Sequence, residues 1–308
     1  MISVVIPFYN EKENLPILID KLTSQLEKIG EKYEIILIDD GSDDEYQISN
    51  PAFRERRGNI KNQKEKIKIF IHRKRRGKGE ALKTGVTNAS GDLIVFMDAD
   101  LQDDPEDLPK FIKKINQGYD FVNGVRVNRQ ENFLVKLYSK IAGWFLKTFL
   151  HSPFSDINCG FKVFKKEVLQ DFVFYGNNFR FFPLYVFYQG FKVGEVEVKN
   201  NPRRFGKSKF GKGKIFVGLL DLITALFLFK FSEKPLHFFG ILGGLISFIG
   251  LLILGYLGYE RIFHNVLLYR RPILWFGILM VIVGLQILAT GIIGELIVYF
   301  ENKRKLNS

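Results

Sequence analysis

The first hundred residues alternate between short apolar runs rich in Val and Ile and longer stretches with apolar residues at helical spacing. Short continuous apolar runs are typical of strands buried on both faces, and helical spacing is typical of helices that cover a sheet. This rhythm predicts βαβ units and a mostly parallel sheet. The expected strands are residues 2–6, 33–38, 67–71 and 93–97, and the expected helices are residues 15–29 and 79–88.

The C-terminal third has a different pattern, with two long runs, residues 235–259 and 272–294, that contain no Asp, Glu, Lys or Arg. Each run is long enough to cross a hydrocarbon core of about 30 Å. We therefore expect a transmembrane hairpin over residues 235–300, with its second span ending near residue 297. A short basic tail, residues 301–308, follows it.

Two further apolar stretches carry lysines at their edges. Residues 214–231 are too short and too polar for a clear span, so we expect an amphipathic helix in the membrane interface, with a third span as the alternative. Residues 133–150 repeat apolar side chains every fourth position, which fits an interfacial helix or a helix packed on the core.

The formal net charge of +12 is concentrated in residues 54–68, 72–78 and 203–214, which predicts an anionic partner. No helix-turn-helix, zinc-finger or RNP pattern accompanies these basic runs, so we expect no nucleic acid partner, and a lipid bilayer and phosphorylated ligands fit better. The single cysteine, Cys159, excludes an intramolecular disulfide and agrees with a reducing compartment. The chain begins with a strand rather than a signal peptide. We expect a multi-pass protein of the cell membrane whose large domain, residues 1–213, is cytoplasmic.

One strand ends abruptly in Asp98 and Asp100, with Gln102 two positions further on. In an extended chain, alternation would place these three side chains on one side. Carboxylate and amide oxygens suit a hard cation such as Mg²⁺ or Mn²⁺. A bare Asp-x-Asp is common in solvated loops, so the prediction of a metal site depends on the position of this motif at a strand end.

Polar residues also follow the first two strands, at residues 7–11 and 39–42. Ligands of parallel sheets bind beyond the carboxyl ends of the strands, so these residues are expected to meet Asp98 and Asp100 at one edge. The first strand is not followed by Gly-x-Gly-x-x-Gly, and no P-loop motif occurs. The sequence therefore argues against a dinucleotide dehydrogenase and against a P-loop phosphotransferase.

Taken in order, six motifs resemble those of the inverting glycosyltransferases of the GT-A fold, and more closely the polyprenyl-phosphate glycosyltransferases related to dolichyl-phosphate mannose and glucose synthases. The resemblance covers about residues 1–215 and implies an α/β, Rossmann-like catalytic domain. The motifs are PFYNE at 7–11, IDDGS at 38–42, GKGEAL at 77–82, DADLQ at 98–102, DINCGFK at 156–162 and RRFGKSK at 203–209.

The resemblance implies a donor site in which Asp98, Asp100 and Gln102 hold the metal. The residues that it implies for binding the nucleotide part of the donor are Pro7, Tyr9, Glu11, Asp39, Lys78, Asp98, Arg203, Ser208 and Lys209. For Asp39, turn formation and helix capping remain an alternative, because Asp-Asp-Gly-Ser suits both. Lys78 has the alternative of a solvated lysine.

On the acceptor side, the resemblance implies that Arg126, Lys136 and Ser139 bind a lipid phosphate, and Arg126 matches best. Asp156, with Asp100, is the implied catalytic carboxylate, and Asp156 aligns with the usual general base. A phosphomonoester has a second pKa of about 6 and needs little deprotonation at neutral pH. Positioning therefore remains an alternative role for Asp156, and capping a turn is another.

The resemblance, together with the predicted spans, implies inverting transfer of a single hexose from a nucleotide sugar to a dolichyl or undecaprenyl phosphate. Residues 158–162 resemble the glucosyl-type members, which places UDP-glucose ahead of GDP-mannose. A processive polysaccharide synthase is one rival interpretation. The family that this interpretation resembles needs a Gln/Arg-x-x-Arg-Trp motif, and neither Trp144 nor Trp275 lies in such a motif. A non-catalytic lipid-phosphate-binding membrane protein is the other rival. Self-association into a homo-oligomer is left open.

Overall fold

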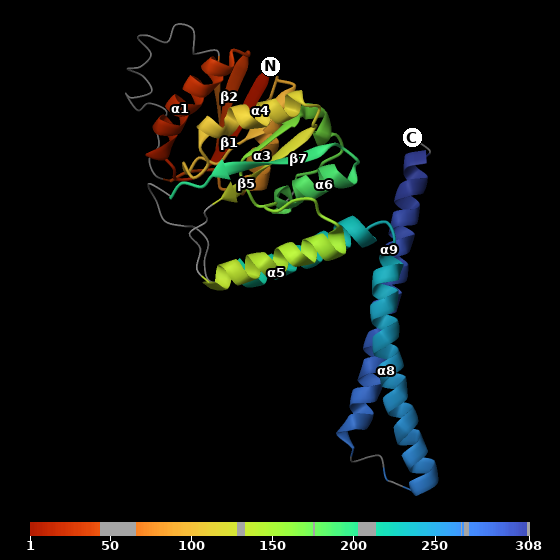
Figure 1. Ribbon diagram of the computed structural model, residues 1–308. Coiled ribbons are helices and arrows are strands. Elements are labelled where there is room, and N and C mark those ends of the chain that lie inside the picture. Colours follow the sequence, from red (N-terminus) through yellow and green to blue (C-terminus); the bar gives the residue numbers. More distant parts are fainter. Residues whose placement is uncertain are drawn as a thin grey trace. The chain divides into compact units, whose positions relative to one another are not determined.

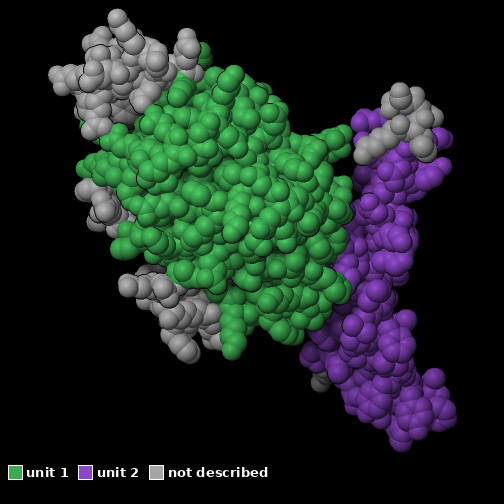
Figure 2. Space-filling model, turned by 45° about the horizontal axis from the view of Figure 1, so that its top comes forward, with its two compact units in different colours: residues 1–216 green, residues 217–308 purple. Residues whose placement is uncertain are grey.

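A computed structural model describes residues 1–43, 66–127, 133–174, 176–202, 214–265, 267 and 271–306, and within these ranges the side chains of 133–138, 214–217, 219 and 305–306 lie outside the description. The chain divides into two compact units, residues 1–216 and 217–308 (Figure 2).

The first unit is built on a seven-stranded sheet in the order β3-β2-β1-β4-β6-β5-β7 (Figure 1). Parallel pairing joins β3 to β2, β2 to β1, β1 to β4 and β5 to β7, whereas β6 runs antiparallel to both β4 and β5. The strands are β1 (Ile2–Phe8), β2 (Tyr33–Asp39), β3 (Ile67–Ile71), β4 (Leu93–Phe96), β5 (Phe121–Val127), β6 (Lys162–Lys165) and β7 (Val193–Lys199).

Helices cover both faces of this sheet (Figure 1). Alternate side chains of β1, such as Val4 and Ile6, join a core with α1 and α4, while Val5 faces the other way and lies against α3. Beside α3, ring contacts join Phe182 of α6 to Phe164 of β6. The helices are α1 (Asn14–Ile29), α3 (Lys78–Thr87), α4 (Leu108–Asn116), α5 (Phe133–Leu150) and α6 (Phe182–Tyr188), with 3-10 turns at Pro105–Asp107, Lys166–Leu169 and Asn178–Phe181.

The predicted mixed α/β architecture with a mostly parallel sheet is confirmed. The expected strands and helices of the first hundred residues are present, with ends that differ by a few residues. The antiparallel β6 was not predicted, because its four residues are too few to show a period.

The second unit contains α8 (Pro235–His264) and α9 (Pro272–Leu306), and both helices are long and apolar enough to cross a membrane. Helix α7 (Lys214–Leu226) and a π-helical segment (Phe227–Phe231) precede them, over the stretch expected at the interface. Helix α9 continues through most of the predicted tail, so residues 301–306 are helical. The membrane location of these helices stays a prediction.

Helices α8 and α9 pack against each other through small residues. A Cβ added at Gly243 would lie 2.5 Å from the carbonyl oxygen of Gly284, and one added at Gly250 would lie 2.9 Å from that of Gly277. Such close backbone approach is typical of helix pairs in membranes, where packing rather than hydrophobic burial drives association.

Replacing Gly243 by Leu is therefore expected to force the two helices apart and to destabilise the hairpin by about 1–3 kcal/mol. Gly244 is the matched control, since no atom lies within 4 Å of a Cβ built there. Thermal unfolding of the full chain in detergent measures the effect. Equal unfolding midpoints for Gly243→Leu and Gly244→Leu would show that the interface does not need the small residue.

Candidate active site

The loops after β1 and β2 are tied together at the carboxyl edge of the sheet. The backbone N–H of Asp40 donates to the carbonyl of Phe8 at 2.9 Å, and that of Asn10 donates to Ser42 Oγ at 3.0 Å. Asn10 has a φ of 55°, a left-handed conformation that asparagine adopts more readily than most residues. Two of the predicted polar motifs therefore form one continuous surface.

Asp39, Glu11 and Tyr9, all predicted at the donor nucleoside, lie in or beside these loops. Asp39 accepts a hydrogen bond from the backbone N–H of Ser42 at 2.8 Å, which is the turn-forming role left open above. Glu11 accepts from Asn14 Nδ2 at 2.6 Å at the start of α1. The guanidinium of Arg75 lies 4.3 Å from the ring centroid of Tyr9. One face of the Tyr9 ring is therefore covered by this guanidinium. Pro7 is buried within β1.

Asp40 organises the basic loop before α3, a role that the sequence analysis missed. Its carboxylate accepts from the backbone N–H groups of Arg76 and Gly77, both at 2.8 Å, and lies 2.9 Å from His72 Nδ1. The other ring nitrogen of His72 lies 3.0 Å from Thr84 Oγ1. A buried carboxylate with this many partners fixes where the next residue, Lys78, begins its helix.

The segment that carries Asp98 and Asp100 is not extended. Strand β4 ends at Phe96, Ala99 and Asp100 form a turn, and Leu101 has a φ of 60°. The expectation that strand alternation would align Asp98, Asp100 and Gln102 is therefore wrong. A buried leucine in the left-handed region is strained, and such strain is typical of functional loops.

Lys78 forms a short ion pair with Asp98. Burial of Asp98 acts to raise its pKa, but the charges of Lys78, Lys162 and Arg126 outweigh burial and hold the pKa of this carboxyl below its usual range. Lys78 is therefore not a free solvated lysine. It neutralises a carboxylate of the candidate metal motif.

A second carboxylate, Asp103, faces Asp98 across Gly160. A Cβ at Gly160 would lie 2.5 Å from Asp98 Oδ2 and 3.1 Å from Asp103 Oδ2, so no other residue fits between them. Burial, together with the charges of Asp98 and Asp100, raises the pKa of Asp103 to about 7. The sequence showed this residue directly after Gln102 but gave no reason to assign it a role.

Arg126 of β5 and Asp156 form a bidentate ion pair, with Nε to Oδ2 at 2.8 Å and a terminal guanidinium nitrogen to Oδ1 at 3.1 Å. Asp156 is almost fully buried, and the backbone N–H of Asn158 also donates to its Oδ1 at 3.3 Å. The predicted acceptor-binding cation and the predicted base thus contact each other. Two of the five N–H groups of the guanidinium are used, which leaves others for a phosphate.

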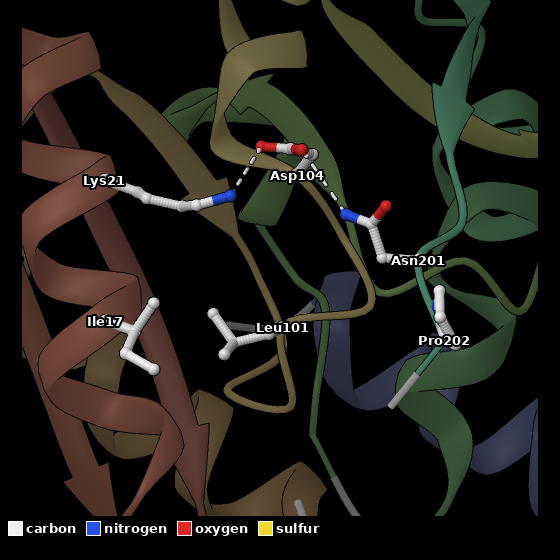
Figure 3. Close-up of a pocket in the computed structure, with 6 residues that line it drawn as sticks. All are labelled: Ile17, Lys21, Leu101, Asp104, Asn201 and Pro202. Carbon is white, nitrogen blue, oxygen red and sulfur yellow. Dashed lines mark hydrogen bonds and ion pairs between the residues drawn. The ribbon is translucent and has the colours of Figure 1, made fainter. Parts of the chain in front are cut away.

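The segment after Asp98, which carries the candidate metal ligands, is joined to the residues that follow β7. Asp103 pairs with Asn200 in a β-bridge, and the backbone N–H of Asn201 donates to the carbonyl of Gln102 at 2.9 Å. Figure 3 shows Asp104 between Lys21 of α1, at 3.7 Å, and Asn201 Nδ2, at 3.3 Å, beside a cavity of about 260 Å³ into which Leu101 points. Residues 200–202, which precede the RRFGKSK motif, are therefore held beside the segment that carries Asp100 and Gln102.

Four predicted binding residues lie outside what the structure describes. They are Arg203, Ser208 and Lys209 of the phosphate loop, and the side chain of Lys136 in α5. Ser139, also in α5, is half-buried. The roles of all five at substrate phosphates stay predictions.

Comparison with known proteins places this site in a family. The model of "Glycosyl transferase family 2" matches residues 3–180, which include every strand from β1 to β6. The chain belongs to glycosyl transferase family 2. Within this family, the site residues from Asp39 to Asp156 all lie inside the matched region.

Relatives extend over nearly the whole chain. The dodecaprenyl-phosphate galacturonate synthase of Rhizobium johnstonii is 29% identical over 96% of this chain and 87% of its own length. The undecaprenyl-phosphate 4-deoxy-4-formamido-L-arabinose transferase of Enterobacter sp. is 31% identical over 96% of this chain and 88% of its own length. Both alignments are too long to omit the two apolar helices.

Solved structures show the same fold for the catalytic unit. Glucosyl-3-phosphoglycerate synthase from Mycobacterium tuberculosis, crystallised with Mn²⁺ and UDP-glucose, superposes with a TM-score of 0.55 at 19% identity, over 73% of this chain and 78% of that one. A second structure of that enzyme, which also contains phosphoglyceric acid, gives a TM-score of 0.54 at the same identity, over 74% of this chain and 78% of that one.

The oxygen ligands of the family 2 site fit a hard divalent cation. Asp98 and Asp103 both lie against Gly160, so two carboxylates face the same small space. In the described ranges no three His, Cys, Asp or Glu side chains form a ready-made metal cluster. The site therefore suits Mg²⁺ or Mn²⁺ held by one or two carboxylates, with amide, water and substrate phosphate oxygens completing the shell.

Cys159 is a packed residue of this site. It is buried, and burial raises the pKa of its thiol to about 11. Its Sγ lies so close to β5 that a Cβ at Gly124 would come within 2.7 Å of it. A thiol of this kind is a poor nucleophile at neutral pH.

Proposed function

We propose that this family 2 enzyme transfers a single sugar, with inversion, from a nucleotide sugar to a polyprenyl phosphate at the cytoplasmic face of a membrane. The observation that carries the proposal is the arrangement of charge at one edge of the sheet. Lys78 forms an ion pair with Asp98 in the motif assigned to the sugar donor. Arg126, which is paired with Asp156, supplies a separate cation for the acceptor phosphate. The names of both relatives and the two apolar helices support a lipid-linked acceptor.

Each group has a defined task in this reaction. Arg126 binds the acceptor phosphate, whose oxygen attacks the anomeric carbon as the bond to the nucleoside diphosphate breaks. Asp156 orients the guanidinium, so its main contribution is positioning rather than proton removal. Lys78 moves from Asp98 to the donor diphosphate and offsets the charge that develops on it. Asp98, Asp100 and Gln102 would hold Mg²⁺ or Mn²⁺, with Asp103 facing Asp98 across Gly160, and the bound cation would supply Lewis-acid stabilisation of the leaving group.

The donor is proposed from the residues near Cys159, which place UDP-glucose ahead of GDP-mannose. The names of the relatives add galacturonate and 4-deoxy-4-formamido-L-arabinose to the sugars that need testing. The names of both relatives contain a polyprenyl phosphate, so they support the same class of acceptor although they differ in the sugar.

Transfer of radiolabelled sugar by the full chain in detergent tests this function. The assay compares UDP-glucose, GDP-mannose, UDP-galacturonate and UDP-4-deoxy-4-formamido-L-arabinose with a short polyprenyl phosphate, with Mn²⁺ or with EDTA. We expect a single-sugar lipid product from one donor, with at least 90% of the activity lost in EDTA and restored by Mn²⁺ (an estimate of about one order of magnitude or more). A ladder of products would favour a processive synthase. No product from any donor would favour a binding protein.

A further inference from the structure

Lys162 is a buried cation in the middle of the sheet. It lies in β6, opposite Phe96 of β4 and Asn123 of β5, and is only 5% exposed. Its neighbours along the strand, Val163 and Phe164, are fully buried and apolar. A lysine is rarely buried this deeply unless a partner compensates its charge.

The protein gives this ammonium little compensation. In the described part of the chain its hydrogen bond goes to the carbonyl oxygen of Cys159, and no carboxylate forms an ion pair with it. An ammonium has three N–H donors. The buried ammonium of Lys162 therefore retains N–H groups that could donate hydrogen bonds to a ligand.

The ammonium of Lys162 lies at the end of the site where the nucleotide sugar is proposed to bind. Lys162 lines one cavity together with Lys78, Asp98 and Asn158. Lys78 takes the ion-pair position on Asp98, and the charge of Asp98 acts on Lys162 from further away. A buried cation beside an already paired carboxylate suits an incoming anion.

We propose that Lys162 binds phosphoryl oxygens of a substrate, as a fixed cation at the floor of the cavity between β4 and residues 157–160. The inference rests on the proposed function, since it names a residue for the same site. The ligand chemistry is a phosphate, which could belong to the donor diphosphate or to the lipid acceptor. Its position beside Asp98 favours the donor diphosphate.

Lys162→Met removes the charge and keeps a long apolar stem. Lys165→Met is the matched control, because Lys165 lies on the same strand but pairs at 2.7 Å with Asp120, outside the cavity. The full-length variants are titrated in detergent with UDP and Mn²⁺, with GDP and Mn²⁺, and separately with a short polyprenyl phosphate, and their transfer rates are measured.

The expected result is nucleotide binding at least about tenfold weaker in Lys162→Met and changed less than about twofold in Lys165→Met, with the lipid phosphate affinity unchanged. If Lys162→Met loses affinity for the lipid phosphate and keeps its affinity for the nucleotide, Lys162 is assigned to the acceptor phosphate instead. If the wild type transfers sugar and Lys162→Met binds both ligands as tightly as the wild type does, the inference is overturned and the proposed function stands. A wild-type protein that neither binds nucleotide nor transfers sugar would instead refute the function.

Unfolding midpoints show whether Lys162→Met is folded, and removal of an undercompensated buried charge should leave the midpoint equal or higher. If the variant does not fold, an experimental structure of the wild-type chain with UDP and Mn²⁺ decides. An Nζ at hydrogen-bond distance, about 3 Å, from a phosphate oxygen would support the proposal. A bound diphosphate that leaves Nζ only on the Cys159 carbonyl would overturn it.

Discussion

Asp98→Asn is expected to lower kcat/KM for sugar transfer by about 10²–10³-fold, because it removes the carboxylate on which the candidate metal site and Lys78 converge. The substitution keeps the shape of the side chain and its place beside Gly160. Loss of the charge should weaken Mn²⁺ binding as well as the rate. Radiolabel transfer and titration with Mn²⁺ in the presence of UDP measure the two effects.

Asp92→Asn is the matched control for this change. Asp92 precedes the same strand, its side chain is 96% exposed, and its carboxylate lies at a long distance of 3.7 Å from the N-terminal amine. Its loss should change the rate by less than about twofold, as expected for an exposed ion pair. Equal rates and equal Mn²⁺ affinities for Asp98→Asn and the wild type would remove Asp98 from the metal site.

The second large effect is expected from the pair of Arg126 and Asp156. Each of Arg126→Met and Asp156→Asn should lower kcat/KM for the lipid acceptor by about 10²-fold, since one loses the phosphate-binding cation and the other its orientation. Residues that act as a unit give non-additive effects. The double variant should therefore be about as slow as either single variant.

Lys165 and Asp120 provide a control pair at 2.7 Å that is more exposed and lies outside the site. The corresponding double-mutant cycle should leave the rate nearly unchanged. Arg126→Lys adds a geometric test, because lysine keeps the charge but cannot form the bidentate contact. Additive effects of Arg126→Met and Asp156→Asn, with the larger loss in kcat for Asp156→Asn, would restore Asp156 as an independent base.

Local patterns predicted the local structure well. The Val- and Ile-rich runs became β1 and β2, and the helical spacing at residues 15–29 became α1, because both periods depend on neighbours in sequence. The antiparallel β6 escaped this approach, since a strand of four residues has no readable period. The turn at Leu101 also escaped it, because its left-handed φ is imposed by surrounding structure on a residue that does not favour it.

The candidate site was predicted in part. The motifs placed Asp98, Asp156 and Arg126 among the functional residues, but they assigned Arg126 and Asp156 to separate tasks. Thirty positions separate these two residues, and the contacts of β5 with β6 and with the loop before β6 bring them together. Asp40, Asp103 and Lys162 were all visible within or beside the motifs, yet the sequence contains no signal of their burial.

Membership of family 2, the alternation that builds the sheet, and the two apolar runs without Asp, Glu, Lys or Arg, residues 235–259 and 272–294, can all be read from the sequence. These features follow from local composition and spacing, which act wherever the chain folds. The three-dimensional fold was needed to show that Lys78 pairs with Asp98, that Arg126 pairs with Asp156, and that Lys162 is buried with one hydrogen-bond partner in the described chain. The strength of a charge depends on how far it is desolvated and on what lies within a few ångströms, and strand order sets both.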